Sequence, residues 1–452
     1  MNKKNNTNRQ PLEYGDLLKN KLMNKTAIVG VVGLGYVGLP LAVEKAKVGF
    51  NVIGFDRNAE RVGQINRGEN YIKDVKNEEL EELAAKKQIM ATTDFSKMAG
   101  VDVIVICVPT PLTITRDPDI SYIVNVAEEI ARYIKPGQLI TLESTTYPGT
   151  TSEIILPKLE AAGLKVGLDF FLAFSPERVD PGNLRYTTKN TSKVVGGITS
   201  VCLDVAKTFY EQTILNIVPV SSTAVAEMTK VFENTYRAVN IALVNEMMLL
   251  CDRMGIDIWE VVDAAGTKPF GIQTFYPGPG VGGHCIPIDP FYLTWKAREY
   301  DFHTRFIELA GEVNIQASYH VIHKVNKVLS NHRKSLNGAK ILVLGVAYKN
   351  DIDDCRESPA LKIIDLLLKE DAQVTYHDAF VPEIKPHAPY TYAMTSVDLT
   401  DEIIEQADCI LITTKHSGVD YEYIVKHAQA VVDTRNACKN IHADLKHKVT
   451  KI

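Results

Sequence analysis

The sequence predicts an α/β protein in which two Rossmann-like, doubly wound parallel-sheet domains are joined by a long central helix within a helical dimerisation domain. Apolar, strand-like runs alternate with helical patterns over the first half of the chain. One long helical pattern then runs from Ser221 to about Met254, and a second strand-and-turn series begins at Lys340. Mostly continuous apolar strands separated by helices are typical of parallel sheets that helices cover on both faces.

The first strand leads into a glycine motif. The apolar run 27–32 is followed by Gly33-x-Gly35-x-x-Gly38 and then by a helix-like segment. In a dinucleotide-binding turn, the first glycine makes the tight bend, the second lets a pyrophosphate approach the backbone, and the third lets helix and strand pack closely. Free N–H groups at the helix start bind phosphate. The motif therefore predicts a dinucleotide site, with Tyr36 and Val37 in the same turn.

The second strand supports the same site and indicates which dinucleotide it takes. The run Val52–Phe55 ends at Asp56, about 20 residues beyond the glycines, where a carboxylate accepts hydrogen bonds from ribose hydroxyls. Asp56 would repel a 2′-phosphate, so NAD is favoured over NADP, although the neighbouring Arg57 weakens this preference.

Further strand-like runs extend the first sheet. They cover residues 101–108, 138–142, 170–174 and 193–195. The turn containing Pro109 and Thr110 follows one of these strands at its carboxyl end, where loops line the ligand crevice of open α/β sheets.

The central helical pattern carries a polar stripe. Ser221-Ser-Thr offers a helix cap and Gly255 a stop. The stripe consists of Glu227, Lys230, Asn234 and Arg237. Its 3–4 spacing places Lys230 and Asn234 on one face. A helix of this length often links domains or subunits, and a solvated surface stripe is an equal alternative for the polar residues.

A second nucleotide-binding-like unit follows residue 338. The run Lys340–Leu344 leads into Gly345, and a later strand is followed by Asp378. Ala347 stands where the second glycine of the motif would be, so we place no second NAD there. The two units suggest one site for a dinucleotide and one for a nucleotide-containing substrate.

The segment 277–290 places one thiol, Cys285, in a glycine-dense turn with Asp289 four residues later. A thiolate beside a nicotinamide suits aldehyde oxidation, because addition of sulfur creates a thiohemiacetal from which hydride can leave to give a thioester. An incidental cysteine in a surface loop is the alternative reading, and the dinucleotide motif favours the functional one.

Composition sets the class of protein. The chain has 452 residues, 45% hydrophobic and 23% charged, with a net charge of −5, which is typical of a soluble protein of two or three domains. No nucleic-acid surface, membrane span or signal peptide is predicted. The seven cysteines form no close pairs and no metal-like spacing, so we expect reduced thiols, a cytoplasmic location and no metal site.

The order and spacing of these motifs resemble the UDP-glucose/GDP-mannose dehydrogenase family over roughly residues 26–445. The segment Gly280-Val-Gly-Gly-His-Cys-Ile-Pro-Ile-Asp-Pro290 is similar to the branch that acts on UDP-N-acetylhexosamines. Members that act on UDP-glucose typically carry Ser and Lys where this chain has His284 and Ile288. This difference disfavours UDP-glucose as the substrate.

The resemblance implies catalytic roles for six residues. Cys285 would be the nucleophile, Lys230 would stabilise the oxyanion with Asn234 beside it, and Glu177 would act as general base or acid. Asp289 would position water and the thiol, and Thr145 would orient a water or the nicotinamide. The alternatives to these catalytic roles are structural: an ion pair between Glu177 and Arg178, and a turn cap at Thr145.

The resemblance also implies two sets of binding residues. The NAD set is Gly33, Gly35, Tyr36, Val37, Gly38, Asp56, Arg57, Pro109, Thr110, Thr145 and Arg356. The UDP-sugar set is Glu177, Arg178, Lys230, Asn234, Lys268, Phe275, Tyr276, Gly282, Lys349 and Arg435. Arg356 has a structural alternative, an ion pair with Asp353 or Asp354.

The resemblance implies four segments and a homodimer. The segments are a flexible N-terminal extension (1–25), an NAD-binding domain (26–220), a central helical dimerisation domain (221–325) and a UDP-sugar-binding domain (326–452). The implied activity is oxidation of UDP-N-acetylglucosamine to a uronic acid for surface polysaccharide. UDP-N-acetylmannosamine, UDP-N-acetylgalactosamine and UDP-glucose are alternative substrates. A non-catalytic NAD-binding regulator and a 3-hydroxyacid dehydrogenase are rivals from outside this activity.

Overall fold

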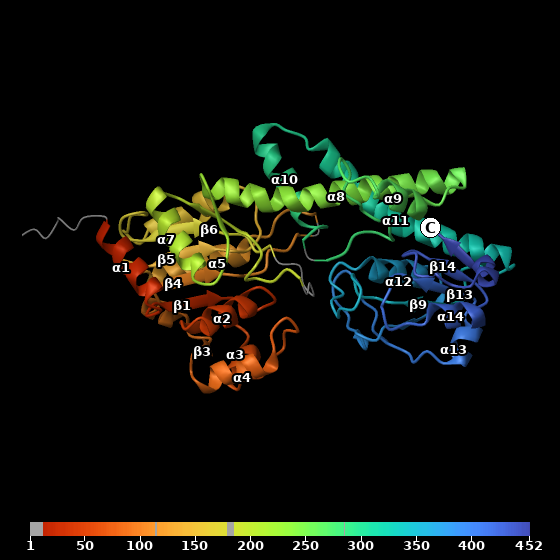
Figure 1. The fold of residues 1–452 in the computed structure, drawn as a ribbon, viewed down its shortest axis with the longest axis horizontal. Coiled ribbons are helices and arrows are strands. Elements are labelled where there is room, and N and C mark those ends of the chain that lie inside the picture. The colour runs from red at the N-terminus through yellow and green to blue at the C-terminus, as the bar shows by residue number, and fades with distance from the viewer. Residues whose placement is uncertain (1–11, 114, 179–184, 284) are drawn as a thin grey trace, which may run out of the picture. The chain divides into compact units, whose positions relative to one another are not determined.

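A computed structural model describes residues 12–113, 115–178, 185–283 and 285–452 (Figure 1). The chain forms two compact units. Unit 1 contains residues 1–233 and 295–300, and unit 2 contains residues 234–294 and 301–452. The long helix α8 (Thr223–Met254) and the shorter α10 (Asp289–Ala297) each contribute residues to both units. The division into segments at residues 26, 221 and 326 therefore remains a prediction.

Unit 1 is built on one twisted sheet with the order β3-β2-β1-β4-β5-β6-β7-β8. Its strands are β1 (Ile28–Val32), β2 (Asn51–Phe55), β3 (Ile89–Thr92), β4 (Val103–Ile106), β5 (Leu139–Leu142), β6 (Phe171–Phe174), β7 (Lys193–Gly197) and β8 (Ile217–Val220). All neighbours are parallel except β6 and β7. The first six strands have the doubly wound order of a dinucleotide-binding sheet, whose order reverses between β1 and β4.

Helices of unit 1 bury both faces of this sheet. They are α1 (Leu12–Met23), α2 (Gly38–Lys47), α3 (Ala59–Asn66), α4 (Asn77–Ala85), α5 (Ser121–Tyr133), α6 (Leu156–Glu160) and α7 (Ser200–Glu211). On β4, Val103 and Val105 belong to one apolar cluster, whereas Ile104 and Ile106 belong to another. Because successive side chains of a strand face opposite sides, the continuous apolar runs in the sequence mark strands that are covered on both sides.

The extension predicted to be flexible is partly ordered. Residues 12–23 form α1, which packs against α7 and buries Leu18 and Leu22. The prediction of flexibility is therefore wrong for these residues, since two leucines at helical spacing anchor the segment. The remaining residues, 1–11, lie outside the described part of the chain.

Unit 2 contains a parallel sheet with the order β10-β9-β13-β14-β15. Its strands are β9 (Lys340–Leu344), β10 (Gln373–His377), β13 (Cys409–Ile412), β14 (Val431–Asp433) and β15 (Val449–Lys451), and a small hairpin pairs β11 (Glu383–Ile384) with β12 (Met394–Thr395). This order is that of a doubly wound nucleotide-binding fold, and it reverses between β9 and β13.

The helices of unit 2 include a second long one. They are α9 (Ile258–Ala265), α11 (Arg305–Asn331), α12 (Pro359–Lys369), α13 (Asp401–Gln406) and α14 (Tyr421–His427). Helix α11 packs against α12 and against β13 and β14. The predicted fold class, with two parallel-sheet units and a long central helix, is confirmed. Of the helices that the structure describes, none is both long and apolar enough to cross a membrane.

Candidate active site

The glycine turn after β1 has the shape that a bound pyrophosphate needs. Gly33 has φ +88°, and a Cβ at this position would lie 2.5 Å from the carbonyl oxygen of Cys107. At Gly38 a Cβ would lie 1.8 Å from the carbonyl oxygen of Gly33, whereas at Gly35 it would meet nothing within 4 Å. Gly33 and Gly38 are therefore required by close packing, and Gly35 leaves open space beside the start of α2, where a phosphate is stabilised.

Asp56 and Thr110 lie at the same edge of the sheet. Asp56 follows β2, and its Oδ2 accepts a hydrogen bond from the Leu34 N–H at 3.0 Å. Arg61 lies 3.8 Å from the same oxygen. Pro109 and Thr110 follow β4, so they stand across the point at which the strand order reverses. The residues at this edge of the sheet fit NAD, because the turn is open and an acid stands at the ribose position.

The loop that bears Thr145 is anchored to α8 by a carboxylate. Glu227 accepts hydrogen bonds from the Gly149 N–H at 2.6 Å, from the Thr151 N–H at 2.9 Å and from the Thr151 hydroxyl at 2.7 Å. Burial raises the pKa of Glu227 to about 7, against the effect of these donors. Thr145 is partly exposed, while Thr146 is buried and its hydroxyl lies 2.6 Å from that of Thr150.

Glu177 lies beside a buried ion pair. The ammonium of Lys193 on β7 lies 2.9 Å from Glu143 Oε2 and 3.7 Å from Glu177 Oε2. Glu143 Oε1 accepts a hydrogen bond from the Tyr210 hydroxyl at 2.8 Å. Burial alone would lower the pKa of Lys193, but the two carboxylates raise it above its ordinary value. A charged lysine therefore holds the carboxylate of Glu177 from one side.

The side chain of Arg178 does not form the ion pair with Glu177 that was the structural alternative for Glu177. Its guanidinium binds Glu233 through two nitrogens, at 3.2 and 2.5 Å, and the Ser192 carbonyl at 2.6 Å. Only its backbone N–H donates to Glu177, at 2.8 Å. The Glu177 carboxylate is thus not neutralised by the side chain of its neighbour.

Helix α8 carries Lys230 and Asn234 one turn apart, and both are buried. The side-chain amide of Asn234 donates to Asp289, and its carbonyl oxygen accepts from Arg237. These two hydrogen bonds fix the orientation of the Asn234 side chain, and one of them connects Asp289 to α8. The structure confirms that the polar stripe is partly interior rather than fully solvated.

The glycine-rich segment before Cys285 is fixed on both sides within unit 2. The Gly278 N–H donates to Asn245 on α8 at 3.0 Å, and Ser318 on α11 donates to the Pro279 carbonyl at 2.7 Å. A Cβ at Gly282 would lie 2.6 Å from Cβ of Tyr348. The glycines thus permit close packing of this segment, and one of them, Gly283, also requires φ +89°.

Cys285 lies in the turn that precedes α10. Its carbonyl oxygen accepts hydrogen bonds from the Ile288 and Asp289 N–H groups at 3.1 and 2.8 Å, so the thiol-bearing residue leads into α10. Its side chain is partly exposed, as is that of Cys355, whereas the other five cysteines are buried. His284, which distinguishes the motif, lies outside the described residues.

Lys349 and Arg435 both follow strands of the sheet in unit 2. Lys349 belongs to the turn after β9, and Arg435 follows β14 and donates from Nε to the Thr413 carbonyl at 2.9 Å. Burial lowers the pKa of Arg435 to about 10, so it stays charged at neutral pH. A Cβ at Gly278 would lie 2.5 Å from its Nη1, which places this cation against the glycine-rich segment.

Arg356 is engaged locally. Its guanidinium binds Asp354 at 2.6 to 3.0 Å through three contacts, as its structural alternative proposed. In the segment 268–276, the ammonium of Lys268 lies over the ring of Phe270. The ring of Phe275 packs edge-on against Tyr236, and the ring of Tyr276 stacks on Trp259. This aromatic region remains a predicted substrate contact.

Several residues that shape these sites were not predicted. Lys193, which pairs with Glu143, holds Glu177; Glu227 holds the Thr145 loop, and Asn245 holds the glycine-rich segment. In the sequence, Glu227 and Arg237 stand out only as members of the polar stripe. Their signal was a polar side chain among apolar helix positions, but the sequence does not say which distant group each one binds.

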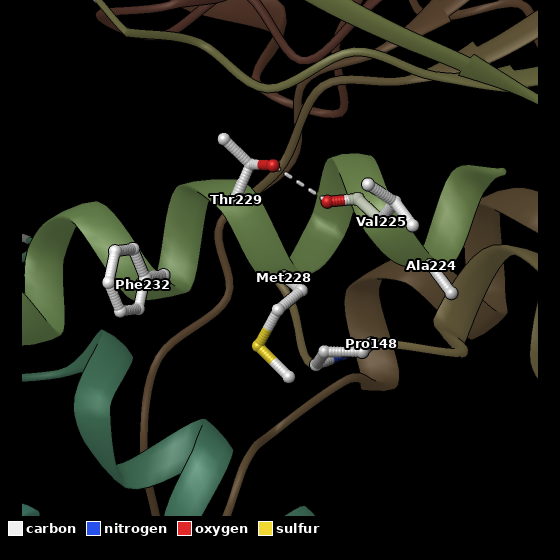
Figure 2. A pocket seen from close by; sticks show the side chains of 6 residues that line it. All are labelled: Pro148, Ala224, Val225, Met228, Thr229 and Phe232. Atoms are coloured by element: carbon white, nitrogen blue, oxygen red, sulfur yellow. Dashed lines mark hydrogen bonds between the residues drawn. The ribbon is translucent and has the colours of Figure 1, made fainter. Parts of the chain in front are cut away.

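An apolar hollow lies on α8 within unit 1. It has a volume of about 490 Å³ and is lined by Pro148, Ala224, Val225, Met228, Thr229 and Phe232 (Figure 2). Phe232 is 63% exposed. Among the described residues, no group of three or more His, Cys, Asp or Glu side chains is placed to hold a metal ion.

Comparisons with known proteins agree with the geometry. The NAD-binding, central and UDP-binding domain models of the UDP-glucose/GDP-mannose dehydrogenase family match residues 27–214, 224–316 and 342–440. A UDP-N-acetyl-D-mannosamine dehydrogenase of Pyrococcus horikoshii is 34% identical over 91% of this chain and 96% of its own length. A UDP-N-acetyl-D-glucosamine 6-dehydrogenase of Pseudomonas aeruginosa is 36% identical over 86% of this chain and 90% of its own.

A solved structure extends the agreement to the fold. The structure of the UDP-D-ManNAc dehydrogenase from Pyrococcus horikoshii superposes with a TM-score of 0.84 at 32% identity, covering 94% of this chain and 99% of that one. The three family models together span most of the sequence, and the relatives align over more than four fifths of it. The chain therefore belongs to the UDP-glucose/GDP-mannose dehydrogenase family and is an NAD-dependent oxidoreductase.

Proposed function

We propose that this enzyme oxidises the carbon-6 alcohol of UDP-N-acetylglucosamine to a carboxylate, using two NAD⁺ for each sugar and a covalent intermediate on Cys285. The observation that supports this proposal most is a partly exposed thiol in the turn before α10, in a segment that glycines and α8 hold in place. An accessible thiol can react as the thiolate, which is a strong nucleophile.

The four-electron reaction proceeds in three balanced stages. The alcohol first loses a proton and a hydride to become an aldehyde. The sulfur of Cys285 then adds to the aldehyde carbon, and loss of hydride from the thiohemiacetal leaves a thioester. Water finally attacks the thioester, releasing the carboxylate and the free thiol. NAD⁺, when bound, accepts the hydride in each oxidation.

The remaining residues supply charge and proton transfer. Lys230 is a buried ammonium that would stabilise the oxyanion of the tetrahedral intermediates. Glu177, held by Lys193, would accept a proton from the attacking water. Asn234 and Asp289 are joined by a hydrogen bond, so Asp289 would be oriented toward the water and the thiol. Each role is the one that the family resemblance implies, and the charge and burial of these residues support it.

UDP-N-acetylmannosamine is the second candidate substrate. Relatives that carry the name of either sugar align with this chain at similar identity, 34% and 36%. The two sugars differ in the orientation of one substituent, and a pocket separates such substrates by the polar groups that it leaves unpaired. UDP-N-acetylgalactosamine and UDP-glucose are the remaining alternatives.

The stoichiometry of the reaction tests the proposal directly. The purified enzyme is incubated with excess NAD⁺ and a limiting amount of each of the four UDP-sugars, and NADH is measured by absorbance. We expect two NADH for each UDP-N-acetylglucosamine consumed and the highest kcat/KM with that sugar. A yield of one NADH would indicate a plain alcohol dehydrogenase, and a higher kcat/KM with another sugar would replace the proposed substrate.

A homodimer is the proposed assembly. Helix α8 presents an exposed apolar stripe at helical spacing, which consists of Val225, Met228, Phe232, Tyr236, Leu243, Met247, Leu250 and Met254. A contiguous exposed apolar surface of this kind marks a protein–protein interface, and a second copy of the chain brings a matching stripe.

Replacing Phe232 by Glu should dissociate this dimer, because the substitution places a charge in the apolar stripe. Light scattering after gel filtration should give twice the chain mass of 50.2 kDa for the wild type and that mass itself for Phe232→Glu. Tyr122→Glu changes an exposed aromatic on α5 and should leave the mass doubled. A wild-type protein that elutes as a monomer at micromolar concentration would contradict the proposal.

A further inference from the structure

Asp378 in unit 2 is a buried carboxylate that binds backbone N–H groups of the turn after β9. It follows β10 and is 2% exposed. Its Oδ2 accepts hydrogen bonds from the N–H groups of Val346 and Ala347, at 2.7 and 3.1 Å. Its Oδ1 accepts from Phe380 and Val381, at 2.8 and 3.1 Å. Asp378 follows the second strand of this unit, the position from which an acid binds ribose in a dinucleotide site. Here its carboxylate instead binds backbone N–H groups and holds a turn.

His416 extends this contact. Its Nε2 lies 3.0 Å from Asp378 Oδ2, and its Nδ1 accepts a hydrogen bond from the Asp351 N–H at 3.0 Å. A backbone N–H can only donate, so Nδ1 carries a lone pair and the ring proton is on Nε2. Burial would raise the pKa of Asp378, but the hydrogen bonds from His416 and Val346 lower it, which keeps the carboxylate charged.

The ring of His416 is held rigidly. It is 2% exposed, and the ring of Phe380 lies 5.0 Å from it at 33°. With one nitrogen on Asp378 and the other on Asp351, the imidazole joins the buried end of β10 to the turn 348–354. Neither contact can rotate away without leaving a buried polar atom unpaired.

The turn 348–354 is tied to the same place by a second contact. Asp351 Oδ1 accepts a hydrogen bond from the Ser417 N–H at 2.9 Å, and Asp351 itself has φ +60°. The Tyr348 N–H closes the turn on the Asp354 carbonyl at 3.0 Å. An uncommon backbone conformation of this kind persists where surrounding contacts determine it. Lys349 stands in this turn, next to the Tyr348 that packs on Gly282 and Gly283.

We propose that His416 is a positioning residue for the UDP-sugar: it fixes the turn 348–354 so that the ammonium of Lys349 is ready for the diphosphate. The inference rests on the substrate role that is proposed for Lys349. A lysine side chain has much rotational freedom, so the fixed part of its site has to be its backbone. Holding a binding residue in its bound position before the ligand arrives increases affinity by reducing the ordering that binding requires.

Two substitutions of His416 separate its two hydrogen bonds. In His416→Gln, the amide nitrogen can still donate to Asp378, but no acceptor remains for the Asp351 N–H. In His416→Asn, the amide oxygen takes the place of Nδ1 and can accept from Asp351, while Asp378 keeps its four backbone donors. His416→Gln therefore removes one of the two contacts of Asp351 that hold the turn, and His416→Asn keeps both.

Titration calorimetry with UDP, together with steady-state kinetics, measures the effect. We expect His416→Gln to raise the Kd for UDP and the KM for the UDP-sugar by about tenfold, the effect of one lost hydrogen bond. His416→Asn should stay within about twofold, and both variants should keep the wild-type KM for NAD⁺. Wild-type affinity in His416→Gln would overturn the inference. So would equal losses in both variants accompanied by a changed KM for NAD⁺, because they would indicate a general structural role.

A double variant tests whether His416 acts through Lys349. Lys349→Met alone should weaken UDP binding, and adding His416→Gln to it should weaken binding by less than a further twofold. The inference would be overturned if the two substitutions raised the Kd for UDP by independent factors that multiply in the double variant. It would also be overturned if Lys349→Met bound UDP with wild-type affinity. Because UDP binding is measured without turnover, a protein that shows these effects and oxidises no UDP-sugar would reject the proposed function while keeping the role of His416.

Discussion

Replacing Cys285 by Ser is expected to slow turnover to the carboxylate by about three orders of magnitude or more, because a serine hydroxyl stays protonated and adds poorly to an aldehyde. The affinity for NAD⁺, measured by fluorescence titration, should stay within about twofold of the wild type, since the glycine turn of unit 1 is unchanged. The first oxidation needs no nucleophile, so any residual activity should yield at most one NADH for each sugar.

Cys355→Ser is the matched control for this prediction. Cys355 is also a partly exposed thiol of unit 2, but burial raises its pKa to about 12, so it is a poor nucleophile. This variant should keep turnover within about twofold. Turnover close to wild type in Cys285→Ser would remove the thiol from the mechanism and with it the covalent route.

Replacing Lys193 by Met should destabilise unit 1 strongly. Glu143 is 1% exposed and Lys193 is 4% exposed, so the substitution leaves a buried carboxylate without its cation. Removing one partner of a buried ion pair typically costs about 3–5 kcal/mol. For a unit of this size, that corresponds to a fall of about 10 °C in the unfolding midpoint measured by calorimetry. Activity measured below this midpoint should also fall, because Glu177 loses the same cation.

Two further variants make this prediction specific. Lys86→Met removes a lysine from an exposed pair with Glu82 on the surface and should shift the midpoint by about 1 °C or less. The double variant Lys193→Met with Glu143→Gln leaves no unpaired charge and should recover part of the lost stability. A midpoint for Lys193→Met as close to wild type as that of Lys86→Met would show that the buried pair contributes little.

Local patterns predicted the parts of the fold that depend on neighbours in sequence. The strands around Gly33 and Gly345 were found because both faces of each strand are buried, which makes the runs continuously apolar. The end of α8 at Gly255 follows from helix stop chemistry. The error at residues 12–23 has the same origin, since two leucines in a polar context were too weak a signal for a packed helix.

The candidate site was predicted only as far as its reactive groups. A thiol among glycines, an acid after the second strand and a lysine on the long helix each carry their chemistry in their own residue type. The groups that orient them are ordinary polar residues far away in sequence. Glu143 and Lys193 are 50 residues apart, and Asn234 and Asp289 are 55 apart.

The sequence by itself determined the family, the two nucleotide-binding sheets and the cofactor, and it singled out the thiol that we propose as the nucleophile. Only the tertiary structure decided which carboxylate meets which cation, and that Asp378 and His416 hold the turn of Lys349 rather than bind a ribose. The physical reason is that a buried polar atom must find a partner wherever the fold brings one, and that partner is set by packing across the chain, not by residue type or local spacing.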